Sequence, residues 1–451
     1  MNNKIKKLAL LIGDIVLLYL SLYLTLLIRY GQGQTYYPWQ IHFWPFTFIF
    51  LIWLIIFYIS NLYNLHLAVN NSKFFQLTAR TLIIADLISV AFFYLWPGLT
   101  IAPKRNLFIF FIIYTILFLF WRQFYNWSLK AYLPKYNLAF VGYNDQVKEL
   151  IDEIQQKQHL GYQAVLIVDQ NLTQVGKLPV LKNVAELPDL ITRKKINNII
   201  LSADPHQSLE LSTTLFNCLP LKINFLSLPD FYESITGKVP IDAINQIWFL
   251  ENLNEGSKLW FDFLKRAYDS ILASFIFIVT LPFWPIISLI IRFESKGPVF
   301  IIMPRVGRNN QIFKLIKFRT MREEGNDRSP TRTNDPRITK FGFFLRRTRL
   351  DEIPQLINII RGEMSFVGPR PERPELNEQL TNTITFYNKR TLVKPGLTGS
   401  DQISGEYHSP SLADSLKKLQ YDLFYIKNRS LYLDLSIILK TIATVLSRKG
   451  I

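Results

Sequence analysis

Residues 269–293 read DSILASFIFIVTLPFWPIISLIIRF, and this stretch decides how the second half of the chain is arranged. Its length would allow a membrane-spanning helix, since about 20 apolar residues suffice. However, Pro282 and Pro285 stand in its middle, where each removes a backbone donor and kinks a helix. Each half of about 12 residues rises roughly 18 Å, less than the roughly 30 Å of a bilayer core. We therefore expect a re-entrant helical hairpin over 265–293.

Basic residues flank this stretch on both sides and indicate where its two ends lie. Lys265 and Arg266 precede it, and Arg292 and Lys296 end it. Positive residues remain on the cytoplasmic side of a membrane, so both ends are expected in the cytoplasm. The alternative is a kinked full span, which would place the rest of the chain outside the cell.

Upstream, four apolar runs predict a transmembrane domain of four helices within residues 1–130. Lys and Arg are more frequent on the side of the N-terminus, which places that end inside the cell. The intramembrane acids Asp14 and Asp86 either mark a functional pathway or bond a neighbouring helix. The runs are 8–28, 41–62, 80–97 and 106–127.

The segment 136–250 changes character. Short β-branched runs alternate with helical spacing, which predicts a small parallel α/β, Rossmann-like domain in the cytoplasm. Its first turn, VGYNDQV (141–147), carries one glycine where a dinucleotide fingerprint needs three. We therefore interpret it as a degenerate nucleotide-binding-like domain with a regulatory or scaffolding role. The alternative is a membrane-tethered reductase that uses NAD(P)H.

Charge and cysteine content narrow the function of this 451-residue chain. Between residues 265 and 451 there are 30 Lys and Arg against 17 Asp and Glu, a net charge of +13. Such a segment needs an anionic partner, or else presents a solvated basic face. Nucleic acid is not expected, because no groove-reading motif is present. The single cysteine, Cys218, excludes an intrachain disulfide and cysteine-based zinc sites.

Within the basic segment, residues 349–356 read RLDEIPQL and place Asp351 next to Glu352. Apolar residues at helical spacing follow, so a helix is expected with Pro354 in its first turn and Asp351 as N-cap. The helix dipole and neighbouring arginines would favour the ionised carboxylate, which suits attack on phosphorus. The simpler alternative is a capping acid at a salt-bridged helix start.

Four blocks in this segment carry a resemblance to a known family. They are KFRTM (317–321), DEIPQL (351–356), SFVGPRP (365–371) and KPGLTG (394–399). In this order they resemble the bacterial sugar transferases, the monotopic phosphoglycosyl transferases that start glycan assembly on polyprenol phosphate. The resemblance covers about 258–451 and implies a mostly α-helical catalytic domain there. The preceding regions resemble the large members, which act in capsule, O-antigen or exopolysaccharide synthesis.

The resemblance implies transfer of a sugar 1-phosphate, of hexose type, from a UDP-sugar to undecaprenyl phosphate, with release of UMP. Asp351 would attack the sugar-bearing phosphate and form a covalent aspartyl–phosphosugar, and Glu352 would assist. Both carboxylates would hold Mg²⁺. Guanidinium and ammonium groups match phosphate oxygens. The candidate substrate-binding residues are Lys317, Arg319, Arg337, Arg349, Pro369, Arg370 and Pro371.

The implied partners are the UDP-sugar, undecaprenyl phosphate and membrane lipids, with no nucleic acid, and a homodimer is left open. The implied location is the bacterial inner membrane, with the active site facing the cytoplasm. Residues 431–446 are expected either as an amphipathic helix on the membrane surface or as a helix packed on the core. The alternative function is a non-enzymatic scaffold or regulator of a polysaccharide assembly complex, for which the dyad would be dispensable.

Overall fold

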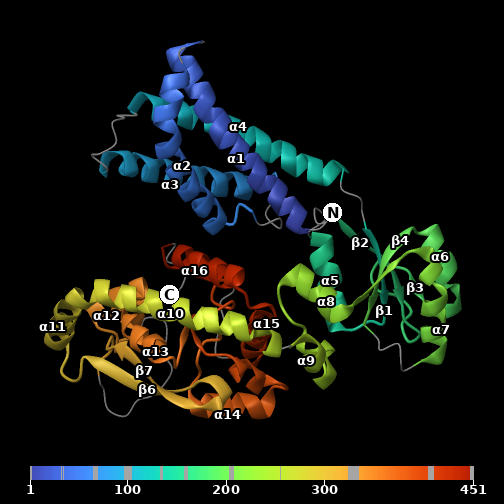
Figure 1. The fold of residues 1–451 in the computed structure, drawn as a ribbon. Coiled ribbons are helices and arrows are strands. Elements are labelled where there is room, and N and C mark those ends of the chain that lie inside the picture. Colours follow the sequence, from blue (N-terminus) through green and yellow to red (C-terminus); the bar gives the residue numbers. More distant parts are fainter. Residues whose placement is uncertain are drawn as a thin grey trace. The chain divides into compact units, whose positions relative to one another are not determined.

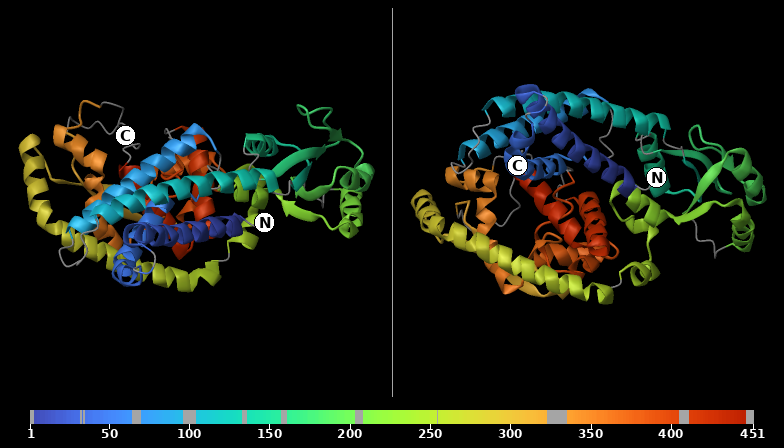
Figure 2. Two further views of the ribbon diagram at one scale, coloured as in Figure 1. Left: turned by 90° about the horizontal axis from the view of Figure 1, so that it is seen from above. Right: turned by 45° about the horizontal axis from the view of Figure 1, so that its top comes forward.

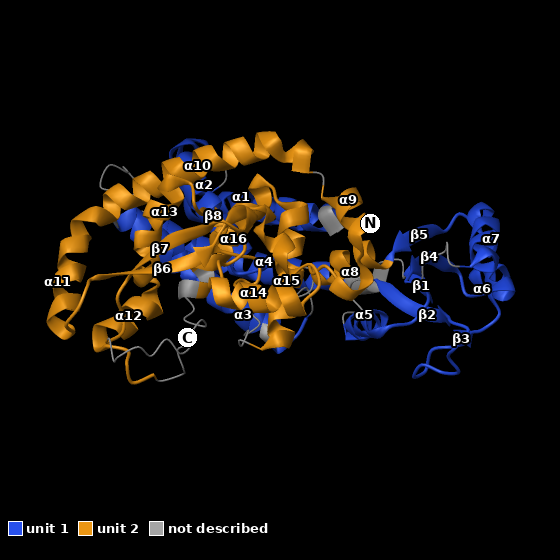
Figure 3. Ribbon diagram, turned by 90° about the horizontal axis from the view of Figure 1, so that it is seen from below, with its two compact units in different colours: residues 1–227 blue, residues 228–451 orange. Residues whose placement is uncertain are grey.

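The computed structural model describes residues 3–446 apart from 32, 34, 64–69, 96–103, 133–135, 157–160, 203–207, 254, 323–334 and 405–410. The chain divides into two compact units, residues 1–227 and 228–451, which have separate colours in Figure 3. Each unit has its own buried apolar clusters.

Four long helices open the first unit, where the four apolar runs predicted them (Figure 1). Each is long and apolar enough to cross a membrane. Aromatic side chains fill the bundle, and the rings of Trp53 and Tyr114 lie 5.0 Å apart, edge to face. The prediction of four apolar helices is therefore confirmed. Their bounds are α1 Asn3–Tyr30, α2 Tyr36–Ile59, α3 Ser72–Leu95 and α4 Lys104–Tyr132.

The two acids inside these helices differ in their surroundings. Arg122 of α4 donates through Nη2 to Asp14 Oδ2 of α1 at 2.6 Å, and both side chains are buried. A buried charge is tolerated when it is paired, so Asp14 bonds a neighbouring helix. For Asp86 of α3 this account does not hold, because its Oδ1 is buried with no hydrogen-bond partner among the described residues.

A parallel five-stranded sheet follows in the first unit, as predicted, with the order β3-β2-β1-β4-β5. This order is that of doubly wound nucleotide-binding folds. Helix α5 lies on one side of the sheet, and α6 and α7 lie on the other (Figure 1). The strands are β1 Tyr136–Val141, β2 Tyr162–Val168, β3 Val180–Leu181, β4 Ile196–Leu201 and β5 Asn224–Ser227. The helices and turns are α5 Asp145–Gln156, η3 Val184–Glu186, α6 Leu187–Arg193, α7 Leu209–Asn217 and η5 Leu219–Leu221.

The sequence predicts that the α/β region extends to residue 250, whereas the last strand of the sheet ends at Ser227. The apolar side chains of Ile241, Trp248 and Phe249 pack into the core of the second unit. The division between units therefore falls at 227/228. The elements that follow are α8 Leu228–Thr236, η6 Ile241–Ala243, α9 Gln246–Asn252 and η7 Glu255–Lys258.

The stretch with the two prolines forms two helices joined by a short turn. Helix α10 (Leu259–Thr280) leads through η8 (Leu281–Phe283) into α11 (Trp284–Glu294), which runs in a different direction (Figure 2). Pro285 lies in the first turn of α11, where a missing N–H costs nothing. Large apolar side chains of both helices are exposed, and Gln246–Glu294 is a fifth candidate membrane segment by length and composition.

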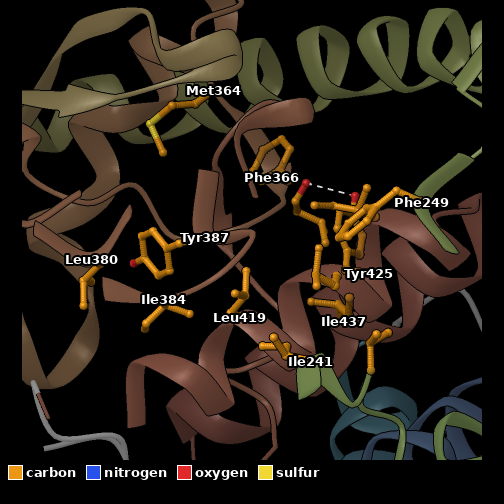
Figure 4. Packing of buried hydrophobic residues seen from close by; sticks show 14 of the residues in the cluster. Ile241, Phe249, Met364, Phe366, Leu380, Ile384, Tyr387, Leu419, Tyr425 and Ile437 are labelled. Atoms are coloured by element: carbon orange, nitrogen blue, oxygen red, sulfur yellow. Dashed lines mark hydrogen bonds between the residues drawn. The ribbon is translucent and has the colours of Figure 1, made fainter. Parts of the chain in front are cut away.

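The remainder of the second unit is mostly helical, with two small sheets. Figure 4 shows part of its core, where the Tyr425 hydroxyl donates to the Val367 carbonyl at 3.1 Å. The strands are β6 Phe300–Val306 with β7 Ile312–Phe318, antiparallel, and β8 Ser365–Val367 with β9 Gly396–Thr398, parallel. The helices are α12 Lys340–Thr348, α13 Leu356–Arg361, α14 Pro374–Thr383, α15 Leu412–Asn428 and α16 Leu431–Leu446. The 3₁₀ turns are η9 Arg308–Asn310, η10 Leu350–Gln355 and η11 Tyr387–Leu392.

Candidate active site

The acidic dyad lies in η10, a 3₁₀ turn between α12 and α13. Arg349 ends α12 in the left-handed conformation, with φ of 59°, and its carbonyl accepts from the Glu352 N–H at 3.2 Å. This differs from the expectation of a regular helix with Asp351 as N-cap. The cap position belongs to Arg349, because the chain reverses there, and Pro354 lies inside the 3₁₀ turn. The regular helix α13 begins only at Leu356.

Glu352 is held by cations from three separate segments. Its Oε1 accepts from Lys317 Nζ of β7 at 2.7 Å and from Arg370 Nη2 at 3.2 Å, and Arg349 Nη1 lies 3.8 Å away. The Glu352 side chain is only 9% exposed. Burial alone would raise the pKa of Glu352, but Arg370 and Lys317 outweigh it and hold that pKa well below its usual range. Glu352 is therefore a fixed negative charge that collects positive ones.

Asp351 is buried beside it, yet its Oδ1 has no hydrogen-bond partner among the described residues. Burial raises the pKa of Asp351, and the charge of Glu352 raises it further. Lys317, Arg349 and Arg346 act in the opposite direction but do not outweigh these causes. The expectation that the surroundings favour the ionised form is therefore wrong in direction. A buried carboxylate oxygen without a partner is costly, which makes it a candidate for contact with a ligand.

Two predicted phosphate-binding residues have other partners. The Arg319 side chain is buried and donates through Nη2 to the Ser295 carbonyl at 2.6 Å. Arg337 donates through Nε and Nη2 to the two carboxylate oxygens of Asp335, at 2.9 and 2.7 Å. Arg319 thus ties β7 to the end of α11, and Arg337 is held in a local ion pair. Neither contacts the dyad in this arrangement.

The turn Pro369–Arg370–Pro371 is fixed by its backbone. The Pro369 carbonyl accepts from the Gly396 N–H at 2.9 Å, and the Arg370 carbonyl accepts from Arg390 Nη2 at 2.9 Å. Arg390 itself is buried and ion-paired with Asp422 at 2.9 Å. Sequence reasoning missed Arg390, because a single arginine outside the four family blocks carries no local signal.

Arg346 was also missed as a site residue, although it stands in the arginine cluster before the dyad. It donates through Nε to Thr320 Oγ1 at 2.8 Å, and its charge interacts with Asp351. Its signal was present in the sequence, because it lies five residues before Asp351 and so near the same turn.

Two buried residues align the elements that carry these groups. Asn358 of α13 donates through Nδ2 to the Lys314 carbonyl at 2.7 Å and accepts from the Ile316 N–H at 3.2 Å, which fixes β7 against the dyad. Arg266 of α10 donates to the carbonyls of Ile359 and Ile360, at 2.6 and 2.7 Å, at the end of α13. Lys317 and Glu352 therefore meet because β7, α13 and α10 are bonded together.

The dyad fits Mg²⁺ only in part. In enzymes this ion uses one or two carboxylates together with substrate phosphates. The described residues include no cluster of three or more His, Cys, Asp or Glu side chains suited to a metal. The unpartnered Oδ1 of Asp351 fits the ion. Glu352 does not, because its Oε1 already accepts from Lys317 and Arg370.

Two family models match the chain. One is described as bacterial sugar transferase and matches residues 260–448, which include the dyad. The other is described as a CoA-binding domain and matches residues 58–229, which include the sheet.

Curated proteins match over the same region. The UDP-glucose:undecaprenyl-phosphate glucose-1-phosphate transferase of Klebsiella pneumoniae is 32% identical, over 68% of this chain and 67% of that protein. The protein of the same name from Escherichia coli K12 is 42% identical, over 40% and 39%. A UDP-N-acetylgalactosamine-undecaprenyl-phosphate N-acetylgalactosaminephosphotransferase of Aeromonas hydrophila is 33% identical, over 52% and 55%.

The chain spans about half the length of the curated relatives that it matches. With the Klebsiella protein, however, the similarity reaches two thirds of both chains, and it is joined by a family match over the region of the dyad. The chain therefore belongs to the bacterial sugar transferase family.

Proposed function

We propose that this protein transfers a sugar 1-phosphate from a UDP-sugar to undecaprenyl phosphate, as a first membrane step of surface polysaccharide synthesis. The observation that carries the proposal is the buried pair Asp351 and Glu352, with cations from three separate segments around Glu352. A concentration of positive charge beside a partnerless carboxylate suits a diphosphate substrate. The names of the relatives agree with this chemistry.

In the first step, an Asp351 carboxylate oxygen attacks the sugar-bearing phosphorus of the UDP-sugar. The bond from this phosphorus to the bridging oxygen breaks, and UMP leaves with the electron pair. Lys317 and Arg370, held in place by Glu352, neutralise the phosphate oxygens during attack. Mg²⁺, held between Asp351 and the diphosphate, would offset the phosphate charge.

In the second step, a phosphate oxygen of undecaprenyl phosphate attacks the same phosphorus. The bond to Asp351 breaks, the free carboxylate returns, and the sugar diphosphate remains on the prenyl chain. Glu352 stays ionised throughout because its cations lower its pKa. Its work is to position Lys317 and Arg370, so its loss should slow both steps.

The membrane arrangement follows from the same demand, since one substrate is soluble and the other is a lipid. We propose that α10 and α11 enter one leaflet of the inner membrane as a re-entrant hairpin with both ends in the cytoplasm. Their exposed apolar side chains and the break at Pro282 support this. Tags inserted near residues 258 and 325 should both report cytoplasmic; a periplasmic report at 325 would show a full span.

The decisive experiment measures intact protein mass after incubation with a panel of UDP-sugars and Mg²⁺, without acceptor. The correct donor should add the mass of a sugar phosphate and release one UMP, and undecaprenyl phosphate should then remove the added mass. Asp351→Asn should be folded and gain nothing. If folded Asp351→Asn protein gains the same mass, Asp351 is not the nucleophile. A scaffold or regulator would show no added mass with any donor.

A further inference from the structure

A cavity of about 260 Å³ opens beside the dyad, and its walls are mostly apolar. It lies within the second unit, among α10, η10, α13, the β8–β9 pair and α16. Residues from four different elements supply aliphatic side chains to it, which excludes a chance gap along one helix. The aliphatic lining comprises Ile276, Ile353, Leu356, Leu397, Ile438 and Ile442.

One part of the lining has a different character. Glu352 lines the cavity together with Arg346, Arg347 and Arg349. Three guanidinium groups against one carboxylate leave this part positively charged. Gln402 also lines it, and its Oε1 is buried without a hydrogen-bond partner among the described residues. The cavity therefore joins an apolar interior to a basic, polar region at the catalytic dyad.

We infer that this cavity binds the first isoprene units of the acceptor lipid, with the lipid phosphate at Arg346, Arg347 and Arg349. The inference rests on the proposed function and adds where the acceptor binds. Apolar walls match a prenyl chain, and arginines match its phosphate. The donor is a poor occupant, because a sugar and a uridine would leave many hydroxyl and ring polar groups unpaired against aliphatic walls.

The volume limits how much of the lipid can enter. Ligand pockets commonly measure about 300–1,000 Å³, so this cavity is at or below the small end of that range. A long prenyl chain cannot be contained in it and must leave after its first units. Ile442 of α16 lines the cavity and is also 47% exposed, so the chain has an apolar exit along this helix.

Helix α16, which forms one wall, is fixed at two points. Thr441 Oγ1 lies 2.7 Å from Thr398 Oγ1 of β9. Asp434, fully buried, contacts Lys265 and Tyr268 of α10 and accepts from the Tyr425 hydroxyl at 2.8 Å. The cavity wall is therefore attached both to the core and to the proposed membrane hairpin, as a lipid-binding wall requires.

The test compares two variants of α16 in the full-length protein in lipid nanodiscs. Ile438→Trp places a large side chain into the cavity, whereas Leu435→Trp changes an exposed residue of the same helix that does not line the cavity. For each, formation of the phosphosugar adduct is measured first without acceptor. Its discharge is then measured against the concentration of undecaprenyl phosphate.

We expect Ile438→Trp to slow discharge at least tenfold more than it slows adduct formation, mainly by raising the acceptor KM. Leu435→Trp should change neither by more than about twofold. Equal discharge by folded Ile438→Trp and wild-type protein would overturn the inference. Failure of the wild-type protein to form an adduct would instead overturn the proposed function, so the two failures can be told apart.

A second measurement covers the case in which Ile438→Trp does not fold. A prenyl phosphate with a diazirine on its first isoprene unit is photolysed with the wild-type protein, and the labelled peptides are sequenced. Labels at Ile276, Leu397 or Ile438 support the inference, and excess farnesyl phosphate should suppress them. Labels confined to exposed faces of α10 and α11 would overturn it and would indicate general contact with the hairpin.

Discussion

The turn after β1 in the first unit and η10 in the second both place polar side chains at the end of a buried element, but only one turn leaves them without partners. In the first unit, Asp169 accepts from the Tyr143 N–H at 3.1 Å and from the Asn171 N–H at 2.9 Å. Asn144 accepts from the Val147 N–H at 2.9 Å and so caps α5. In η10, the buried Asp351 Oδ1 has no partner among the described residues.

This difference separates a turn that stabilises a fold from a turn that can act on a ligand. Around β1 the polar groups bond one another, and helix α5 has its own cap, so the features that hold a pyrophosphate in dinucleotide-binding proteins are already engaged. Around η10, cations gather from distant segments. The contrast supports a supporting role for the α/β region and places the chemistry in the second unit.

The comparison is broken most directly by Asp351→Asn. Turnover should fall by several orders of magnitude, as with other lost nucleophiles, because the amide cannot attack phosphorus. The thermal melting temperature should change little, since Asp351 Oδ1 makes no hydrogen bond that the substitution would remove. UMP release and thermal melting are measured on the same preparation. Near-normal turnover would remove the distinction between the two turns.

Truncation tests which unit carries the function. A chain of residues 228–451 should fold in detergent and still form the phosphosugar adduct. A chain of residues 251–451 lacks Trp248 and Phe249, and the loss of such a core side chain costs about 3–5 kcal/mol each. It should melt at a clearly lower temperature or not fold. Equal melting temperatures would show that residues 228–250 do not belong to this core.

The pH dependence of adduct formation sharpens the account of the dyad. The pKa of Asp351 is raised, so its ionised form is lost as the pH falls through a value above the usual one for aspartate, and the rate should fall there. Glu352→Gln removes one cause of the raised pKa. The acid limb should therefore move to lower pH, even though the maximal rate is reduced. Single-turnover rates between about pH 4 and 8 check this; a limb that stays or rises would contradict it.

The smallest effect is expected in the first unit. Asp169→Ala removes the acceptor of two backbone N–H groups and should destabilise the α/β region by about 1 kcal/mol. Adduct formation should be unchanged, since the article's proposed chemistry uses no residue of this turn. Urea unfolding and adduct mass are the measurements. A large loss of activity at full folding would assign the turn a part in the chemistry.

Local pattern was enough to predict the four apolar helices, the parallel sheet and the break at Pro282. Each depends on the order of apolar residues, glycines and prolines over a short stretch. The pairing of Lys317 with Glu352 could be guessed only through family resemblance, because the two residues stand 35 positions apart. The 3₁₀ turn was not predicted, since it depends on the left-handed conformation of Arg349, a residue type that rarely adopts it.

The roles of individual arginines were harder still to predict. Arg319 and Arg370 have the same chemistry in sequence, but Arg319 is buried against the Ser295 carbonyl and Arg370 reaches Glu352. Which partner an arginine finds is set by the packing of distant elements. The same applies to the pKa of Asp351, because burial, which sequence does not show, outweighs the nearby cations.

The contact of Arg266 with the end of α13 gives the bilayer a mechanical connection to the reaction. Helix α13 follows the dyad directly, and Arg266 belongs to α10, the first half of the proposed hairpin. A helix whose apolar length does not match the bilayer responds by tilting. Any tilt of α10 would thus pull on the segment that carries the nucleophile, and acyl-chain length would act as a regulator of turnover, with no effector molecule required.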